Sequence, residues 1–180
     1  MWPDTEGGLE ATMRDISAKA SEHDRVLDYG LRIHVVVRKS TSEAQAAADR
    51  LMSRLDAERG QEIKGRAQDS ASAGVLRQDE LREASEDDYI EPNVWSGIGR
   101  ARSGCASALV GDPDEIYDKI QRYMDLGIRA FIFSGYPHLD ECRYFADLVL
   151  PRLERGALPR LRGRLTDEVP ATPLTHGVRR

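Results

Sequence analysis

The fold class of this chain is decided by one stretch, Phe131-Ile132-Phe133-Ser134-Gly135-Tyr136-Pro137-His138. It ends an apolar run, and residues 128–133 have the length and side chains of a fully buried parallel strand. The glycine and proline that follow force a turn at the carboxyl end of this strand. A helix pattern then covers residues 139–153, in which Pro151 is expected to bend or shorten the last turn. Strand, turn and helix in this order predict an α/β fold, in which ligands bind at the carboxyl ends of the strands.

Two further strands with their helices precede this unit, after an opening helix. Residues 31–37 are rich in β-branched side chains and predict a strand, and Ser42 is expected to cap the helix that follows. Residues 106–110 predict a shorter strand, after which Asp112 and Pro113 start a helix. The chain is therefore predicted to contain three consecutive βα units, which do not make a closed fold by themselves.

Two segments lack the pattern of regular elements. Residues 59–91 are mostly small, polar or charged, and the second half of this segment is acidic. A segment of this length in a compact domain is either a solvated insertion or a mobile lid that becomes ordered over a ligand. The tail, residues 160–180, carries Pro170 and Pro173 and is predicted to be disordered. We therefore expect one folded domain over residues 1–159.

Composition and charge narrow the class of protein. The chain has 180 residues, 32% of them charged, and a net charge of -5, which argues against a nucleic-acid binder with a broad cationic face. No apolar run approaches ~20 residues and no signal-peptide pattern opens the chain, so we expect no membrane partner and a cytoplasmic location. Cys105 and Cys142 have no metal-ligand spacing, and no other residues form a convincing metal site. Both thiols are expected to be buried.

Polar side chains gather along the predicted strands or at their ends, namely Arg32, His34, Arg102, Ser134, Tyr136 and His138. Arg32 and His34 are two residues apart, so they face the same side of a strand. A buried arginine without an anion is costly, so this face implies an anionic ligand or a carboxylate partner. Arginines bind sulfonate or phosphate oxygens in a fork geometry.

Each of these residues also has a purely structural interpretation. Arg32 fits an arginine–carboxylate ion pair, with His34 bonded to the backbone. Arg102 fits a solvated loop residue, and Tyr136 and His138 fit residues that close a turn. Their convergence at the place where parallel barrels build their active sites favours a functional site.

Four motifs occur in a fixed order: Leu31-Arg32-Ile33-His34-Val35-Val36-Val37-Arg38, Pro92-Asn93-Val94-Trp95-Ser96-Gly97-Ile98-Gly99, Ala108-Leu109-Val110-Gly111-Asp112 and Ser134-Gly135-Tyr136-Pro137-His138-Leu139. Together they resemble the carboxyl-terminal half of the reduced-flavin-dependent alkanesulfonate monooxygenases, which belong to the bacterial-luciferase-like superfamily. The resemblance covers roughly residues 9–153. The combination of motifs is specific, whereas each motif alone is a weak signal.

The resemblance implies a partial (β/α)8 TIM barrel, formed by the last three βα units of a luciferase-like barrel. It also implies a monooxygenase that uses reduced FMN from a separate NAD(P)H-dependent flavin reductase. With O2, such an enzyme converts an alkanesulfonate to an aldehyde and sulfite in sulfur acquisition. By resemblance the catalytic residues are Arg32, His34, Arg102 and Tyr136, and the cofactor-binding residues are Arg32, Ser134 and His138. The insertion at residues 59–91 falls where the family carries its mobile lid.

The amino-terminal half of that family has no counterpart in these 180 residues. The chain is therefore expected to work as a homo-oligomer or together with an amino-terminal barrel half. Two alternatives stay open. One is a truncated non-catalytic remnant or one part of a split enzyme, and the other is a luciferase-like monooxygenase that acts on another sulfur compound.

Overall fold

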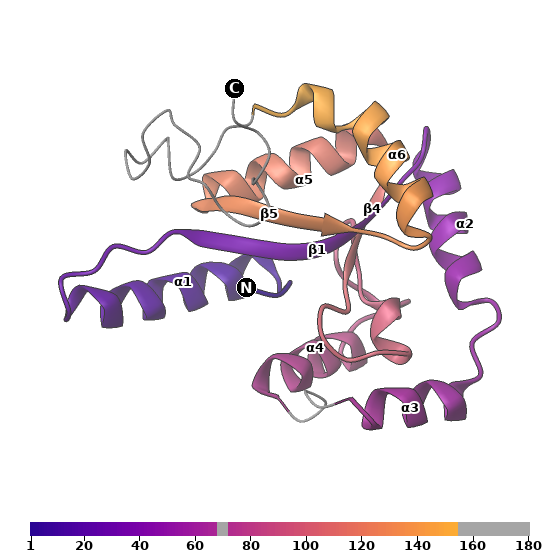
Figure 1. Cartoon of the computed structure of the whole chain (residues 1–180), viewed down its shortest axis with the longest axis horizontal. Coiled ribbons are helices and arrows are strands. Elements are labelled where there is room, and N and C mark those ends of the chain that lie inside the picture. The colour runs from indigo at the N-terminus through magenta and orange to yellow at the C-terminus, as the bar shows by residue number, and fades with distance from the viewer. Residues whose placement is uncertain (68–71, 155–180) are drawn as a thin grey trace, which may run out of the picture.

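The nine-residue strand β1 (Tyr29–Val37) is the longest strand of the sheet in the computed structural model, which describes residues 1–67 and 72–154 (Figure 1). The five strands have the order β2-β3-β4-β1-β5. β1 runs parallel to both of its neighbours, β4 (Ala108–Gly111) and β5 (Ile128–Ser134). The short strands β3 (Val94–Trp95) and β2 (Tyr89–Glu91) continue the sheet antiparallel beyond β4.

His34 is the position on β1 where the two parallel neighbours meet. β5 pairs with the first part of β1 up to His34, and β4 pairs with the last part from His34 onward. His34 therefore lies opposite Ser134 on one side and opposite Ala108 on the other. This stagger brings the carboxyl end of β5 and the amino end of β4 to the same level, and this level holds the candidate site.

From Ile33 to Val37 the side chains of β1 are buried on both sides of the sheet, which is the pattern of a strand covered on both faces. The odd-numbered residues from Leu31 to Val37 share one cluster with buried residues of α1 (Glu6–Ser21) and α5 (Pro113–Asp125) and with Val149. Val36 belongs to the other cluster, with Trp95 and the alanines of α2 (Thr41–Met52). Burial on both faces is why the sequence of this strand is almost continuously apolar.

Helix boundaries follow local signals along the chain. Asp112 caps α5, as predicted, in a capping box where its N–H donates to the Glu115 carboxylate at 2.9 Å. α2 begins earlier than predicted, because Ser40 and not Ser42 accepts a backbone N–H as its N-cap. α6 (His138–Leu148) ends before the proline that was expected to shorten it, and that proline lies in the short 3-10 helix η2 (Leu150–Arg152).

The insertion at residues 59–91, whose sequence predicts a mobile or only partly helical segment, has regular structure along much of its described part. It holds most of α3 (Ala57–Gly65), all of α4 (Ala73–Glu83) and the strand β2, and the 3-10 helix η1 (Gly97–Arg100) follows. α4 buries only Val75 and Gln78, so it has no apolar stripe that periodicity can detect. The role of this segment as a mobile lid stays a prediction.

Some expectations concern residues beyond those described. The predicted disordered tail at residues 160–180 and the last residues of the domain expected over 1–159 lie outside the described ranges. Within residues 1–67 and 72–154, no helix combines the length and the apolar character needed to cross a membrane.

β5 is more exposed than the fully buried strand that the sequence predicted. Ile132 is 64% exposed, because β5 is an edge strand whose neighbour in the described sheet is β1 alone.

The order of the parallel strands differs from that of a closed barrel. In a closed barrel the strands of consecutive βα units lie side by side, whereas here β1 lies between β4 and β5, the strands of two consecutive units. The predicted α/β class and its three βα units are confirmed.

Candidate active site

The candidate site is built around the buried imidazole of His34, which is 1% exposed. His34 Nε2 lies 3.1 Å from the carbonyl oxygen of Cys105, and a carbonyl oxygen only accepts, so Nε2 carries the hydrogen and donates. Nδ1 is then free to accept, and it takes the hydroxyl hydrogen of Ser134 at 2.7 Å. These two bonds fix the tautomer and the orientation of the ring.

The charge state of His34 follows from its surroundings. Burial is the largest cause that lowers the pKa of His34 to about 4, and the nearby charges of Arg102, Arg32 and His138 lower it further. The hydrogen bond to Cys105 opposes this shift but does not outweigh it. His34 is therefore neutral at pH 7 and holds its neighbours in place without carrying a charge.

The side chains of Arg102 and Tyr136 bond to each other beside His34. Arg102 Nη1 donates to the Tyr136 hydroxyl, and Arg102 Nε donates to the Ser103 carbonyl at 3.0 Å. The Tyr136 ring lies 5.3 Å from the His34 ring and 4.8 Å from the His138 ring, measured between centroids. Arg102 comes from the entry loop, defined here as residues 101–107 between η1 and β4, and Tyr136 comes from the turn after β5.

The structure thus brings together five of the six residues predicted for the site, namely His34, Arg102, Ser134, Tyr136 and His138. Arg32 is the exception, since its side chain is exposed and borders a separate hollow of about 560 Å³ beside Trp2 and Ile132. The expectation of a buried Arg32 that requires an anion was wrong, because β1 is still open to solvent at this position. The ion pair considered for Arg32 is not formed among the described residues. The catalytic and cofactor roles of all six residues stay predictions.

A buried ion pair near the turn was missed from the sequence. Arg38, directly after β1, donates to both carboxylate oxygens of Glu141, at 2.6 Å and 3.0 Å, and Glu141 is 3% exposed. Gly135 is buried between these elements, and a Cβ there would overlap the Glu141 side chain and lie 3.0 Å from the Val35 carbonyl oxygen. The sequence offered two signs of this ion pair, a charged residue at a strand end and another in the first turn of a helix. Only the fold shows that these two residues contact each other.

The other missed residue is Gln78, which lies in the insertion and is 3% exposed. Its side chain bonds to the backbone of the entry loop on both sides of Cys105. A glutamine in a polar segment without periodicity carries no sequence signal of burial. Only the fold shows that Gln78 lies against the entry loop.

An apolar cavity of about 560 Å³ adjoins the cluster between β5 and α6, and we call it the α6 cavity. Its walls include Val35, Phe133, Ser134, Gly135, His138, Leu139, Cys142, Phe145, Ala146 and Leu150. Cys142, predicted to be buried, is exposed because it faces this cavity, whereas Cys105 is buried as predicted. Ser134 and His138 therefore border both the polar cluster and an apolar space.

Parallel βα units that collect arginine, tyrosine and histidine near the end of a strand are arranged as in α/β barrels. Comparison with known families makes this specific, because the model of the luciferase-like monooxygenases matches residues 1–130. The chain belongs to the luciferase-like monooxygenase family. Its three βα units are accordingly part of a luciferase-like barrel, as predicted.

Two curated proteins are similar in sequence to this chain. The sulfoquinovose monooxygenase of Agrobacterium fabrum is 52% identical over 180 residues, which are 99% of this chain and 47% of that protein. The sulfoquinovose monooxygenase of Novosphingobium aromaticivorans is 49% identical over 159 residues, which are 88% of this chain and 44% of that protein. The chain thus spans about half the length of these relatives.

Solved structures show the same fold at low sequence identity. DmoA from Hyphomicrobium sulfonivorans has a TM-score of 0.52 at 17% identity, over 97% of this chain and 39% of that chain. Riboflavin lyase, solved with modified FMN and riboflavin, has a TM-score of 0.56 at 14% identity, over 98% of this chain and 41% of that chain. At these identities the comparison concerns the fold alone.

Proposed function

We propose that this chain provides one wall of the active site of a reduced-flavin-dependent monooxygenase that releases sulfite from an organosulfonate. Sulfoquinovose is the first substrate to test, since two relatives near 50% identity are sulfoquinovose monooxygenases. Alkanesulfonates are the second class of substrate to test, because the sequence motifs resemble those of the alkanesulfonate monooxygenases. The observation that carries the proposal is the pair formed by Arg102 and Tyr136.

This pair has the chemistry of a sulfonate site. The Tyr136 hydroxyl accepts from Arg102, so its own hydrogen is left to donate to a ligand oxygen. The guanidinium keeps further N–H groups in its fork, and these suit the oxygens of a sulfonate. His34 is neutral and adds no charge of its own, so the positive charge beside Tyr136 comes from Arg102, and the His34 ring lies 5.3 Å from the Tyr136 ring between centroids. The cluster is therefore a site for an anion.

The residues present fit part of a flavin. The α6 cavity has about 560 Å³, within the roughly 300–1,000 Å³ of small-molecule pockets, and its apolar walls suit a flat ring system. Ser134 and His138 border it and would contact the ring, which supplies the oxidation chemistry when bound. The start of α6 does not suit the FMN phosphate, because Asp140 and Glu141 occupy its first turn. The phosphate contacts are expected on another part of a barrel.

The test is sulfite release. The chain is assayed with sulfoquinovose, O2, FMN and an NAD(P)H-dependent flavin reductase, alone and mixed with the amino-terminal half of the Agrobacterium fabrum relative. We expect sulfite in the mixture, and a loss of about 100-fold or more in kcat/KM for Arg102→Ala, because the sulfonate is no longer oriented. Arg54→Ala is the matched control, since Arg54 is exposed in the turn after α2 and does not lie on the β5 edge.

Sulfite at the level of the relative's half alone, for sulfoquinovose and for a panel of alkanesulfonates, would contradict the proposal. Equal rates for Arg102→Ala and Arg54→Ala would contradict the assignment of Arg102.

A second candidate function, association with a further part of a barrel without catalysis by this chain, is favoured by the exposed edge of β5. If the chain binds the amino-terminal half but the mixture releases no sulfite, the result favours this second candidate function over the first.

A further inference from the structure

We propose that Gln78, in the insertion helix α4, is a positioning residue that sets the place of Arg102 through the backbone of the entry loop. The part of this inference that concerns sulfonate binding rests on the proposed function. The part that concerns the loop rests on hydrogen bonds and burial alone, and it is tested without turnover.

The carboxamide of Gln78 uses both of its ends on the entry loop. Its Nε2 donates to the Gly104 carbonyl at 3.1 Å, and its Oε1 accepts the N–H of Ala106 at 2.8 Å. The residue between them, Cys105, is held from the other side by His34. Three successive residues are therefore fixed by two side chains from different elements, and Arg102 lies two residues before the first of them.

The loop needs this support because its own conformation is unusual. Gly104 has a φ of +84°, a left-handed conformation that glycine adopts without the strain of a side chain. Its carbonyl and the Ala106 N–H are buried, so they require partners from the protein. Gln78 is the side chain that supplies a donor to one and an acceptor to the other.

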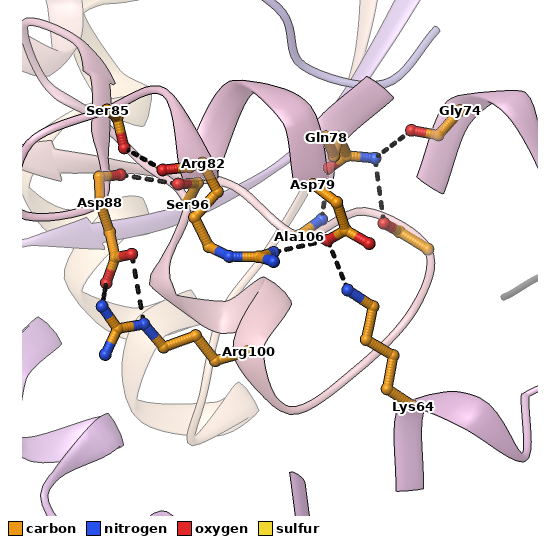
Figure 2. A network of polar contacts seen from close by, with 11 residues as sticks. Lys64, Gly74, Gln78, Asp79, Arg82, Ser85, Asp88, Ser96, Arg100 and Ala106 are labelled. Carbon is orange, nitrogen blue, oxygen red and sulfur yellow. Dashed lines mark hydrogen bonds and ion pairs between the residues drawn. The ribbon is translucent and has the colours of Figure 1, made fainter. Parts of the chain in front are cut away.

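α4 is itself joined to α3 by an ion pair that does not involve the site (Figure 2). Lys64 of α3 and Arg82 of α4 both donate to Asp79, the residue after Gln78. Burial alone raises the pKa of Asp79, but the hydrogen bonds from Lys64 and Arg82 outweigh it and lower the pKa, so Asp79 is ionised. Nearby, Arg100 of η1 pairs with Asp88 at 2.8 Å. Gln78 therefore projects from a fixed helix.

The chain of contacts runs from α4 to the anion site. Gln78 holds the loop backbone, the loop carries Arg102, and Arg102 bonds to Tyr136. Loss of the Gln78 carboxamide would leave two buried backbone groups unpaired, and the loop would shift to solvate them. A displacement of about 1 Å at a binding group is enough to lower activity by roughly 100-fold.

The experiment compares three variants of the full chain. Gln78→Leu removes both bonds at similar size, and Gln78→Glu keeps the acceptor for Ala106 but loses the donor to Gly104. Gln61→Leu is the matched control, because Gln61 is exposed on α3. The first readout is NMR of the ¹⁵N-labelled chain, which reports the Arg102 Nε–H signal and the hydrogen exchange of the Ala106 amide.

We expect Gln78→Leu to speed exchange at Ala106 by roughly 10-fold or more and to move the Arg102 signal, with Gln78→Glu intermediate and Gln61→Leu unchanged. The second readout is the Kd for sulfoquinovose, expected to rise roughly 10- to 100-fold for Gln78→Leu. A purely structural role would lower the melting temperature and leave the Arg102 signal in place.

An unchanged Arg102 signal in both Gln78 variants would overturn the inference, and Gln78→Glu keeps the test valid if the leucine variant fails to fold. If the wild-type chain binds no sulfonate even when mixed with the amino-terminal half of the Agrobacterium fabrum relative, the proposed function fails, while the NMR comparison still decides the role of Gln78.

Discussion

At the scale of single residues, His34 joins three segments that are far apart in the sequence. Its backbone pairs with β4 and β5, and its ring bonds to Cys105 in the entry loop and to Ser134 at the end of β5. The bond that Nδ1 accepts from Ser134 requires the neutral tautomer described above, whereas a protonated ring would still donate from Nε2 to Cys105. A protonated ring would have no acceptor left for the Ser134 hydroxyl and would add a positive charge beside Arg102.

This arrangement predicts an acid-sensitive fold. The pKa of His34 is about 4 in the folded chain and near 6.5 in the unfolded chain, so the unfolded state binds more protons between these values. The free energy of unfolding should therefore fall by up to about 3 kcal/mol as the pH drops from 6.5 to 4. Urea unfolding at a series of pH values measures this change in the free energy of unfolding. His34→Gln should lose this component, whereas the exposed control His23→Gln should keep it, and identical pH profiles for the two variants would refute the role of His34.

At the scale of elements, the ion pair of Arg38 and Glu141 connects the end of β1 to the first turn of α6. Glu141 also packs against the buried Gly135 in the turn before Tyr136, so the pair sets how the turn leaves β5. A carboxylate near the start of a helix is favoured by the helix dipole as well. This element contact, and not the turn sequence alone, supports the position of Tyr136.

Glu141→Gln is expected to destabilise the chain by about 3 kcal/mol, because it leaves the guanidinium of Arg38 without its charge partner at a largely buried position. Chemical denaturation at neutral pH measures the free energy of unfolding. The neighbouring Asp140→Asn is the control, since Asp140 is exposed and its loss should change stability by less than about 0.5 kcal/mol. Equal stabilities for the two variants would show that the pair does not hold the turn.

At the scale of the whole molecule, three βα units by themselves leave an open sheet edge, and the structure places one such edge at β5, a strand that was predicted to be fully buried. It exposes Ile132 and a row of backbone groups with no partner strand beyond it in the described part of the sheet. Exposed edges of this kind pair with other strands. Association with a second copy or with a further barrel part is a proposal that this edge supports.

Replacement of Ile132 by lysine should weaken this association, because a charge at a flat apolar edge opposes strand pairing. Light scattering after gel filtration should give a mass above 20.1 kDa for the wild-type chain and a mass closer to 20.1 kDa for Ile132→Lys. Val26→Lys is the control, since Val26 is 82% exposed but lies outside the sheet. A wild-type chain that stays at 20.1 kDa over a wide range of concentration would argue against association through β5.

The sequence by itself determined the three βα units and the family. Apolar runs, the capping box at Asp112 and the four ordered motifs act over a few neighbouring residues, so they can be read along the chain. They also placed His34, Arg102 and Tyr136 near strand ends, where the structure brings them together.

Only the tertiary structure decided which strand lies beside β1, which arginine is exposed, and which side chains support the site. The exposure of Arg32, the bond between Arg38 and Glu141, and the hold of Gln78 on the entry loop all depend on residues far away in the sequence. Such contacts form through the packing of whole elements, and packing is a property of the folded chain that no local pattern encodes.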